Sequence, residues 1–501
     1  MSGGLTVSAR TAGERGRSRS RAIASVFAAI TVLTFALSAC TSATLQTMKT
    51  TATPQQQRRQ VELAPGEERE HYRILAAYGG QYDNEKLQGV LERTVEKLVA
   101  ASERPDLKYQ ITILNSPAVN AFALPNGQLY VTRGLIALAN DNSEVASVMA
   151  HEMSHVIARH AAIREDQARQ AALVNRVATD LLSDPQLGAL ALAKSKIALA
   201  NFSRAQEFEA DGIGVGISAR AGFDPYGAER FLTSMGHNAQ LRTQRAIDPR
   251  APDFLSSHPA TPERVTNAVA NARQFTGPGS GERDKAEYLA MLDGLVYGED
   301  PSEGFVRGRR FLHPKLGFTF TAPDGFTMDN SAQAVFGVKD SGAQALRLDV
   351  VRVPAEQSLP DYLTSGWIEN IDTKSVEEQM VGGFPAATAT ATGDQWTFRL
   401  YVVRFGSEVY RVIFAAKNRT DAVDRSFRES INTFRRMTVS EMAQAQPLRL
   451  KVVEVKAGDT VEKLAKRMAV ADRQVERFRV LNGLGDKDRV KPGDLMKVVV
   501  E

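Results

Sequence analysis

The chain has a single cysteine among its 501 residues, so no disulfide can form within one chain. It also has little net charge once residues 1–39 are set aside. Those residues carry five arginines and one glutamate, which account for the whole formal charge of +4. The remainder is neutral overall. This balance gives no indication of a nucleic-acid surface, and no nucleic-acid partner is expected.

Long apolar runs are also scarce, and the run at residues 22–36 is short for a membrane span. Arginines precede it, and small residues ending in Cys40 follow it, which is the pattern of a secretory signal. The segment resembles a bacterial lipoprotein signal, which implies removal of residues 1–39 and lipidation of Cys40. A signal anchor and a simple cleaved signal are the alternatives. We therefore expect a periplasmic lipoprotein of the cell envelope, with a lipid anchor in a membrane and the outer membrane favoured.

The most informative motif is His151-Glu152-Met153-Ser154-His155, an HExxH sequence in a segment that reads as a helix. Residues four apart share a helix face, so His151 and His155 can bind one zinc ion. Glu152 can then take a proton from the attacking water and return it to the leaving amine. The apolar flanks predict a buried helix, where two unpaired histidines would be costly.

A catalytic zinc site needs a third protein ligand. His160 falls one residue short of the metzincin spacing, so the segment from Ser203 to Asp211 is the better source. If this segment is a helix, Glu207 and Asp211 share a face. One carboxylate could bind the metal while the other orients a ligating imidazole. Glu209 would point elsewhere, into solvent.

These motifs, in this order, resemble peptidase family M48 of the gluzincin type, and in particular its periplasmic lipoprotein branch. Two further segments agree: residues 120–131 resemble the strand ahead of the active-site helix, and Ser257-His258-Pro259 with Arg264 resembles a downstream HP motif. The resemblance covers residues 66–275, which implies a mainly α-helical metallopeptidase domain.

The resemblance also implies the roles of the site residues. His151, His155 and Glu207 would bind one Zn²⁺ per chain, with Glu152 as general base and Asp211 as the carboxylate that orients a ligand. His258 would be catalytic, either by stabilising the oxyanion or by occupying the open zinc position in a closed state. A histidine that merely caps a loop is the alternative for His258.

Residues 128–134 alternate like a strand. A strand at the border of a cleft can pair with the main chain of an extended substrate, which would give broad specificity. An ordinary structural strand fits the same pattern.

The rest of the chain suggests a multidomain protein. Residues 40–65 read as a flexible tether, and residues 276–305 as a linker after the peptidase domain. Residues 168–200 are rich in alanine and leucine and could form helices that cover the cleft. Residues 306–440 combine alternating strands with a final helix, which indicates an α+β sandwich that resembles the PsbP/Mog1 type. Partner or substrate docking is its expected role.

Residues 447–501 carry a βααβ pattern with Gly458-Asp459-Thr460, Leu481-Asn482 and Pro492-Gly493 in order. This pattern resembles a LysM domain, which implies binding to peptidoglycan. A degenerate LysM that docks only protein is the alternative.

Together these features predict an envelope zinc metalloendopeptidase that cleaves misfolded or unassembled envelope proteins and is held near peptidoglycan. The main alternative is a chaperone-like or wall-binding assembly factor with latent protease activity. A peptidoglycan peptidase is disfavoured by the kind of zinc site.

Overall fold

The computed structural model describes residues 65–166, 169, 203–242, 258–259, 261–332, 334–339, 342–470 and 472–501. The expected signal sequence, Cys40, nearly all of the expected tether, and most of the alanine-rich segment at 168–200 lie outside these residues. Within the described part of the chain, no helix has both the length and the apolar character that crossing a membrane requires.

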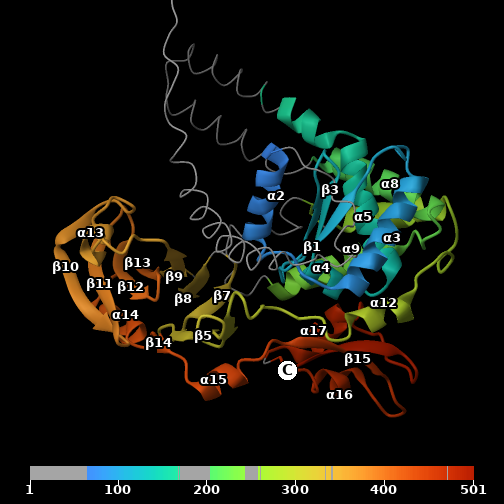
Figure 1. Cartoon of the computed structure of the whole chain (residues 1–501). Helices are drawn as coiled ribbons and strands as arrows, with labels where there is room; N and C mark the ends of the chain where they lie inside the picture. Colours follow the sequence, from blue (N-terminus) through green and yellow to red (C-terminus); the bar gives the residue numbers. More distant parts are fainter. Residues whose placement is uncertain are drawn as a thin grey trace, which may run out of the picture. The chain divides into compact units, whose positions relative to one another are not determined.

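The first region is mainly helical, as expected (Figure 1). Its helices are α2 (Pro65–Ala77), α3 (Glu85–Ala101), α4 (Arg133–Leu138), α5 (Asn142–Ile157), α8 (Arg204–Arg220), α9 (Gly227–Arg242), α11 (Pro262–Arg273) and α12 (Lys285–Leu292). Helix α3 has an apolar stripe at helical spacing, because Leu87, Leu91, Val95 and Leu98 are all buried. That stripe joins a core shared with α5 and the neighbouring strands.

A small sheet lies against the HExxH helix. It comprises β1 (Gln110–Leu114), β2 (Ala121–Ala123) and β3 (Gln128–Thr132), in the order β1-β3-β2, with β3 parallel to β1 and antiparallel to β2. The strand expected at the cleft border is therefore the middle strand, and its main chain is paired on both sides. Among the described residues, the edge strands are β1, whose Leu114 forms an isolated bridge with Gln81, and β2. The structural alternative therefore holds for β3.

Helix α5 packs closely against α8 because a glycine lies at the crossing. A β-carbon at Gly214 would lie 3.0 Å from the backbone nitrogen of His151 and 3.1 Å from its α-carbon. The absence of a side chain lets the two backbones approach directly over the HExxH motif.

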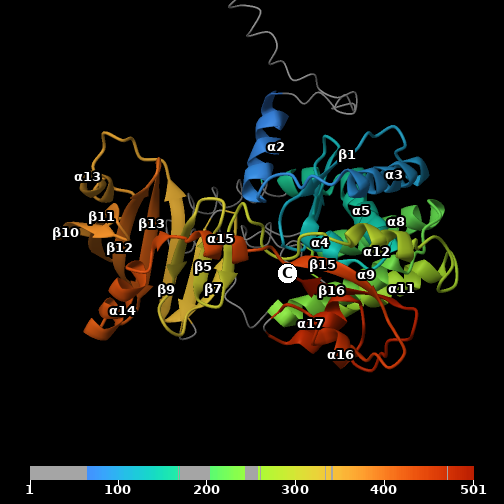
Figure 2. The same cartoon turned by 60° about the horizontal axis from the view of Figure 1, so that its bottom comes forward.

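The later region is rich in sheet (Figure 2). Its elements are β4 (Phe305–Arg307), β5 (Arg310–His313), β6 (Phe318–Thr321), β7 (Thr327–Asn330), β8 (Val335–Lys339), β9 (Gln344–Val351), α13 (Leu359–Leu363), β10 (Ile371–Val381), β11 (Phe384–Thr392), β12 (Thr397–Phe405), β13 (Glu408–Ala416), α14 (Asp421–Ile431), β14 (Arg435–Arg436) and α15 (Val439–Gln444).

Two antiparallel sheets form in this region, one in the order β10-β11-β12-β13-β9-β8-β7 and one in the order β14-β6-β5-β4. An aromatic core joins them, with Phe318 of β6 4.8 Å from Tyr410 of β13 between ring centroids. Helix α14 covers the larger sheet by stacking Phe427 on Phe414. Phe434 lies beyond the end of this helix and is also buried.

The C-terminal residues have the predicted βααβ order: β15 (Arg449–Glu454), α16 (Val461–Ala465), α17 (Gln474–Leu481) and β16 (Leu495–Val500). The two strands pair antiparallel. Their apolar side chains belong to the same core as α3 and α5. Residues 276–305, the expected linker, contain α12 and bond to β15, with the Gly294 amide donating to the Leu450 carbonyl.

One buried cation ties this module to the helical region. The Lys497 ammonium group donates to the carbonyls of Ala137, Leu138 and Ala139 at 2.8, 3.2 and 2.7 Å. These carbonyls lie at the carboxyl end of α4, where a cation is favoured. Burial lowers the pKa of Lys497, and Glu144 at the start of α5 opposes that shift. The module is therefore anchored beside the first turn of the HExxH helix.

The crossing of α5 and α8 gives a test of the fold. Gly214→Ala should lower the free energy of unfolding by about 1–3 kcal/mol, because the added methyl group would overlap the His151 backbone. Gly212→Ala is the matched control on the same helix, since its nearest contact would be 3.7 Å away. The control should gain up to about 1 kcal/mol from lower chain entropy. Calorimetry of both variants measures the difference, and equal stability would contradict the close approach.

Candidate metal centre

Helix α5 places the two histidines of the HExxH motif on one buried face. The Asp141 side chain caps its first turn by accepting from the Glu144 amide. The Nε2 atoms of His151 and His155 lie 3.1 Å apart, and their ring centroids are separated by 4.7 Å. Both imidazoles thus turn the same nitrogen toward one point.

Helix α8 supplies the carboxylates, as predicted. A capping box between Ser203 and Gln206 sets its start, so that Glu207 and Asp211 fall on the buried face. Glu207 Oε1 lies 3.5 Å from His155 Nε2, and Glu207 Oε2 lies 3.6 Å from His151 Nε2. Asp211 Oδ1 is 3.0 Å from the outer nitrogen of His151, Nδ1. One carboxylate faces the cluster and the other lies behind a histidine.

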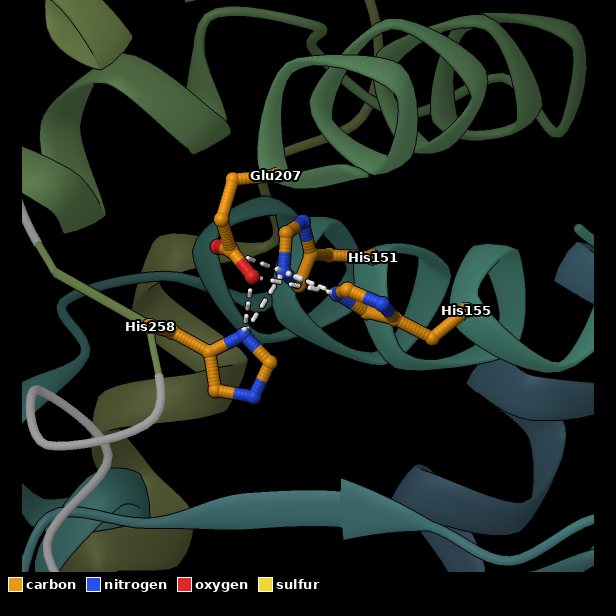
Figure 3. A group of neighbouring side chains, drawn as sticks. All are labelled: His151, His155, Glu207 and His258. Carbon is orange, nitrogen blue, oxygen red and sulfur yellow. Dashed lines mark hydrogen bonds and ion pairs between the residues drawn. The ribbon is translucent and has the colours of Figure 1, made fainter. Parts of the chain in front are cut away.

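His258 completes the cluster from the segment before α11 (Figure 3). Its Nδ1 atom lies 2.9 Å from Glu207 Oε1 and 3.4 Å from His151 Nε2. One ligand atom from each of His151, His155, Glu207 and His258 falls within 4.8 Å of the others, and all four residues are buried. The Nδ1 atom of His258 therefore lies among the candidate metal-ligand atoms.

Arg264 on α11 holds both carboxylates. Its guanidinium group donates to Asp211 at 2.7 and 2.8 Å, and its Nη1 lies 2.7 Å from Glu207 Oε2. Burial raises the pKa of Asp211, but the bonds from Arg264 and His151 outweigh it and bring the pKa to about 2. Arg264 is expected only as part of the HP motif, and no spacing in the sequence indicates this role.

The burial of the histidines favours their neutral form, which is the form that binds a metal ion. Burial is the main cause that lowers the pKa of His151, His155 and His258, which reaches about 3 for His258. Neighbouring imidazoles and Arg264 add to the shift at His155. Neutral imidazoles present lone pairs to a cation.

Glu152 lies in the same buried space and contributes a carboxylate. Its Oε1 atom has no hydrogen-bond partner among the described residues and lies 3.9 Å from His258 Nε2. Burial and the charge of Glu207 raise the pKa of Glu152 well above its usual value, while Arg264 and the Ala123 backbone oppose the shift. A carboxyl group with a raised pKa is suited to accept and return a proton.

The donor set fits a divalent metal ion. Two inward Nε2 atoms 3.1 Å apart, a carboxylate and a third imidazole nitrogen converge at one buried point, and their lone pairs repel unless a cation lies between them. The outer nitrogen of His151 lies beside Asp211, and the outer nitrogen of His155 lies beside His160. The inner nitrogens are therefore left to bind a metal ion.

The segment from Ser203 to Asp211 is expected to supply the third ligand in place of His160, and Glu209 is expected in solvent; only Glu209 lies differently. His160 is not among the inward donors: its Nδ1 is 2.9 Å from the outer nitrogen of His155, Nδ1. Glu209 is 58% exposed, but it does not simply point into solvent, because its Oε2 lies 3.3 Å from His160 Nε2. No spacing rule relates these two residues to the HExxH motif, so the sequence offered no signal. Ser257 and Cys40 lie outside the described residues.

The fold and site define a class: a helical domain with an HExxH helix, a carboxylate from a second helix and a buried metal-type donor set. Residues 85–272 match the family described as Peptidase family M48. This part of the chain belongs to that family, and the mainly α-helical expectation for it is confirmed.

Named relatives agree with this assignment. The Beta-barrel assembly-enhancing protease of Escherichia coli K12 is 34% identical over 188 residues, which cover 36% of this chain and 37% of that protein. The mitochondrial metalloendopeptidase OMA1 of Schizosaccharomyces pombe is 31% identical over 176 residues, covering 35% of this chain and 50% of that protein. The chain thus spans only about two fifths to a half of these relatives' lengths.

Among solved structures, cyanobacterial PsbP from Synechocystis aligns with 27% of this chain and 96% of its own, at 16% identity and a TM-score of 0.22. A score this low carries no argument about the sheet-rich region.

Proposed function

We propose that this protein is a zinc metalloendopeptidase of the bacterial cell envelope that cleaves misfolded or unassembled envelope proteins. The observation that carries the proposal is the convergence of His151, His155 and Glu207 beside the Glu152 carboxyl group. Family M48 and the named proteases support a peptidase. The name of the Escherichia coli relative supports a role linked to β-barrel assembly.

In this proposal His151, His155 and Glu207 hold the zinc ion as a gluzincin set, and Asp211 orients His151 through its outer nitrogen. When bound, zinc supplies Lewis-acid chemistry that polarises the peptide carbonyl and acidifies the attacking water. Glu152 takes the proton of that water on Oε1 and then delivers it to the amine that leaves. Arg264 holds the carboxylates of Asp211 and Glu207 in place through its guanidinium group.

The free edge of β2 is the proposed site for the substrate main chain. Among the described strands, β2 is paired only to β3, and the backbone of Ala123 in β2 interacts with Glu152. An extended peptide added to this edge would bring its carbonyls next to the general base. Main-chain pairing reads little sequence, which suits a protease for unfolded proteins.

His258 supports a latent form of the enzyme. Because its Nδ1 lies among the other ligand atoms, it takes the position that water or substrate needs. This placement favours the closed-state role over oxyanion stabilisation in the described conformation. It also favours the second candidate function, an assembly factor that holds clients and cleaves only when opened.

We also propose that residues 447–501 form a LysM domain that binds peptidoglycan and that Cys40 carries the lipid anchor. The βααβ order and the exposed loops at 456–460 and 485–489 support the LysM assignment.

The purified protein should co-sediment with peptidoglycan, and mass spectrometry of the mature N-terminus should find a diacylated Cys40. Failure to sediment would favour a protein-docking fold, and an unmodified N-terminus would exclude lipidation.

The Glu152→Gln variant tests catalysis directly. It keeps the shape of the side chain and removes the base, so we expect a roughly 10²–10⁴-fold loss of casein cleavage with bound zinc unchanged. Both quantities are measured on the soluble form that begins after Cys40. Cleavage that persists in the variant would contradict the role of Glu152, and absence of zinc in the wild type would contradict the whole proposal.

The His258→Ala variant tests latency. With three ligands retained, we expect zinc to remain bound and basal casein cleavage to rise, because the fourth position is freed for water. Casein cleavage and zinc content are compared with those of His237→Ala, a change on α9 away from the cluster. A loss of activity with zinc kept would instead favour oxyanion stabilisation, and unchanged cleavage would exclude a functional role for His258.

A further inference from the structure

His160 is a buried histidine that the proposed mechanism does not use. It is 1% exposed and lies five residues after His155. The two Nδ1 atoms are 2.9 Å apart, with ring centroids separated by 4.9 Å and planes at 70°. On its other side, His160 Nε2 lies 3.3 Å from Glu209 Oε2. The ring therefore bridges α5 and α8 behind the donor cluster.

A break after helix α5 makes this contact possible. Helix α5 ends at Ile157, and Arg159 then adopts a left-handed conformation with φ of 57°. Its amide donates to the Val156 carbonyl at 3.1 Å, which closes the turn. Such a conformation is uncommon for a residue other than glycine, asparagine or aspartate. The break places His160 against the outer nitrogen of His155.

The direction of the hydrogen bonds follows from the metal-facing atom. His155 turns Nε2 toward the cluster, 3.5 Å from Glu207 Oε1, so the lone pair needed for a metal is on Nε2 and the proton is on Nδ1. Nδ1 then donates to His160 Nδ1. With Nδ1 accepting, His160 carries its own proton on Nε2 and donates it to Glu209. Each of these two N–H groups therefore has one acceptor: His160 Nδ1 for His155, and Glu209 for His160.

We propose that His160 and Glu209 are positioning residues for His155, which fix its tautomer and ring orientation for metal binding. The arrangement parallels the one at His151, where Asp211 lies 3.0 Å from the outer nitrogen. His160, hydrogen-bonded to Glu209, thus orients His155, and Asp211 orients His151. This inference rests on the proposed metal site.

Paired variants separate hydrogen bonding from packing. His160→Leu removes the acceptor, whereas His160→Asn can place an amide oxygen near the position of Nδ1 and keep it. Glu209→Gln keeps an acceptor for His160 Nε2, and Glu209→Ala removes it. Glu96→Ala, an exposed glutamate on α3, is the control for loss of a surface charge.

Two readouts report on the ligand itself: the visible absorption spectrum of the Co²⁺-substituted protein and the rate of zinc transfer to a chelator. His160→Leu should alter the spectrum and speed zinc loss by about 10–100-fold. His160→Asn should recover most of both properties. Glu209→Ala should have a smaller effect in the same direction, because solvent screens an exposed carboxylate, and Glu209→Gln should match the wild type.

The positioning role is overturned if His160→Leu retains the wild-type spectrum and zinc-transfer rate, or if His160→Asn is as damaging as His160→Leu in a folded protein. Far-UV circular dichroism verifies folding of each variant. If the wild type itself binds neither Co²⁺ nor Zn²⁺, the proposed metal site fails and this inference fails with it. Metal binding by the wild type with unaltered variants overturns the positioning role alone.

Discussion

The close approach of α5 and α8 is the constraint on which the site depends. With no β-carbon at Gly214, α8 rests on the backbone of His151, and this brings Glu207 and Asp211 to the two sides of the same imidazole. Arg264 then ties both carboxylates to α11 and offsets their charge in a buried space. A wider crossing would leave His151 and His155 with no carboxylate within reach, so the spacing of two backbones decides the chemistry.

A second consequence concerns the C-terminal module. Its apolar residues share the core of the helical region, and Lys497 binds the end of α4 near Glu144, in the first turn of α5. The module therefore supports the start of the HExxH helix in addition to any ligand it binds. A glycan or protein bound to its exposed loops would therefore contact a module that packs against the HExxH helix.

Much of the site could be predicted from local spacing. Helical periodicity, which can be read directly from a sequence, relates His151 to His155 and Glu207 to Asp211. The segments α3, α5 and α8 are helices, as expected. The rest depends on tertiary contacts. The pairing of β3 on both sides and the bonds of Arg264 arise from packing between distant segments. The placement of His160 depends on the left-handed backbone conformation of Arg159. No periodicity encodes these features.

The central claim is that one metal ion binds at the junction of α5 and α8. Diffraction from crystals of the zinc-loaded protein, recorded on both sides of the zinc absorption edge, tests it most directly. The account predicts a single zinc-specific anomalous peak, about 2.0–2.2 Å from His151 Nε2, His155 Nε2 and a Glu207 oxygen. A peak bound by other residues, or no peak in crystals of the loaded protein, would contradict it.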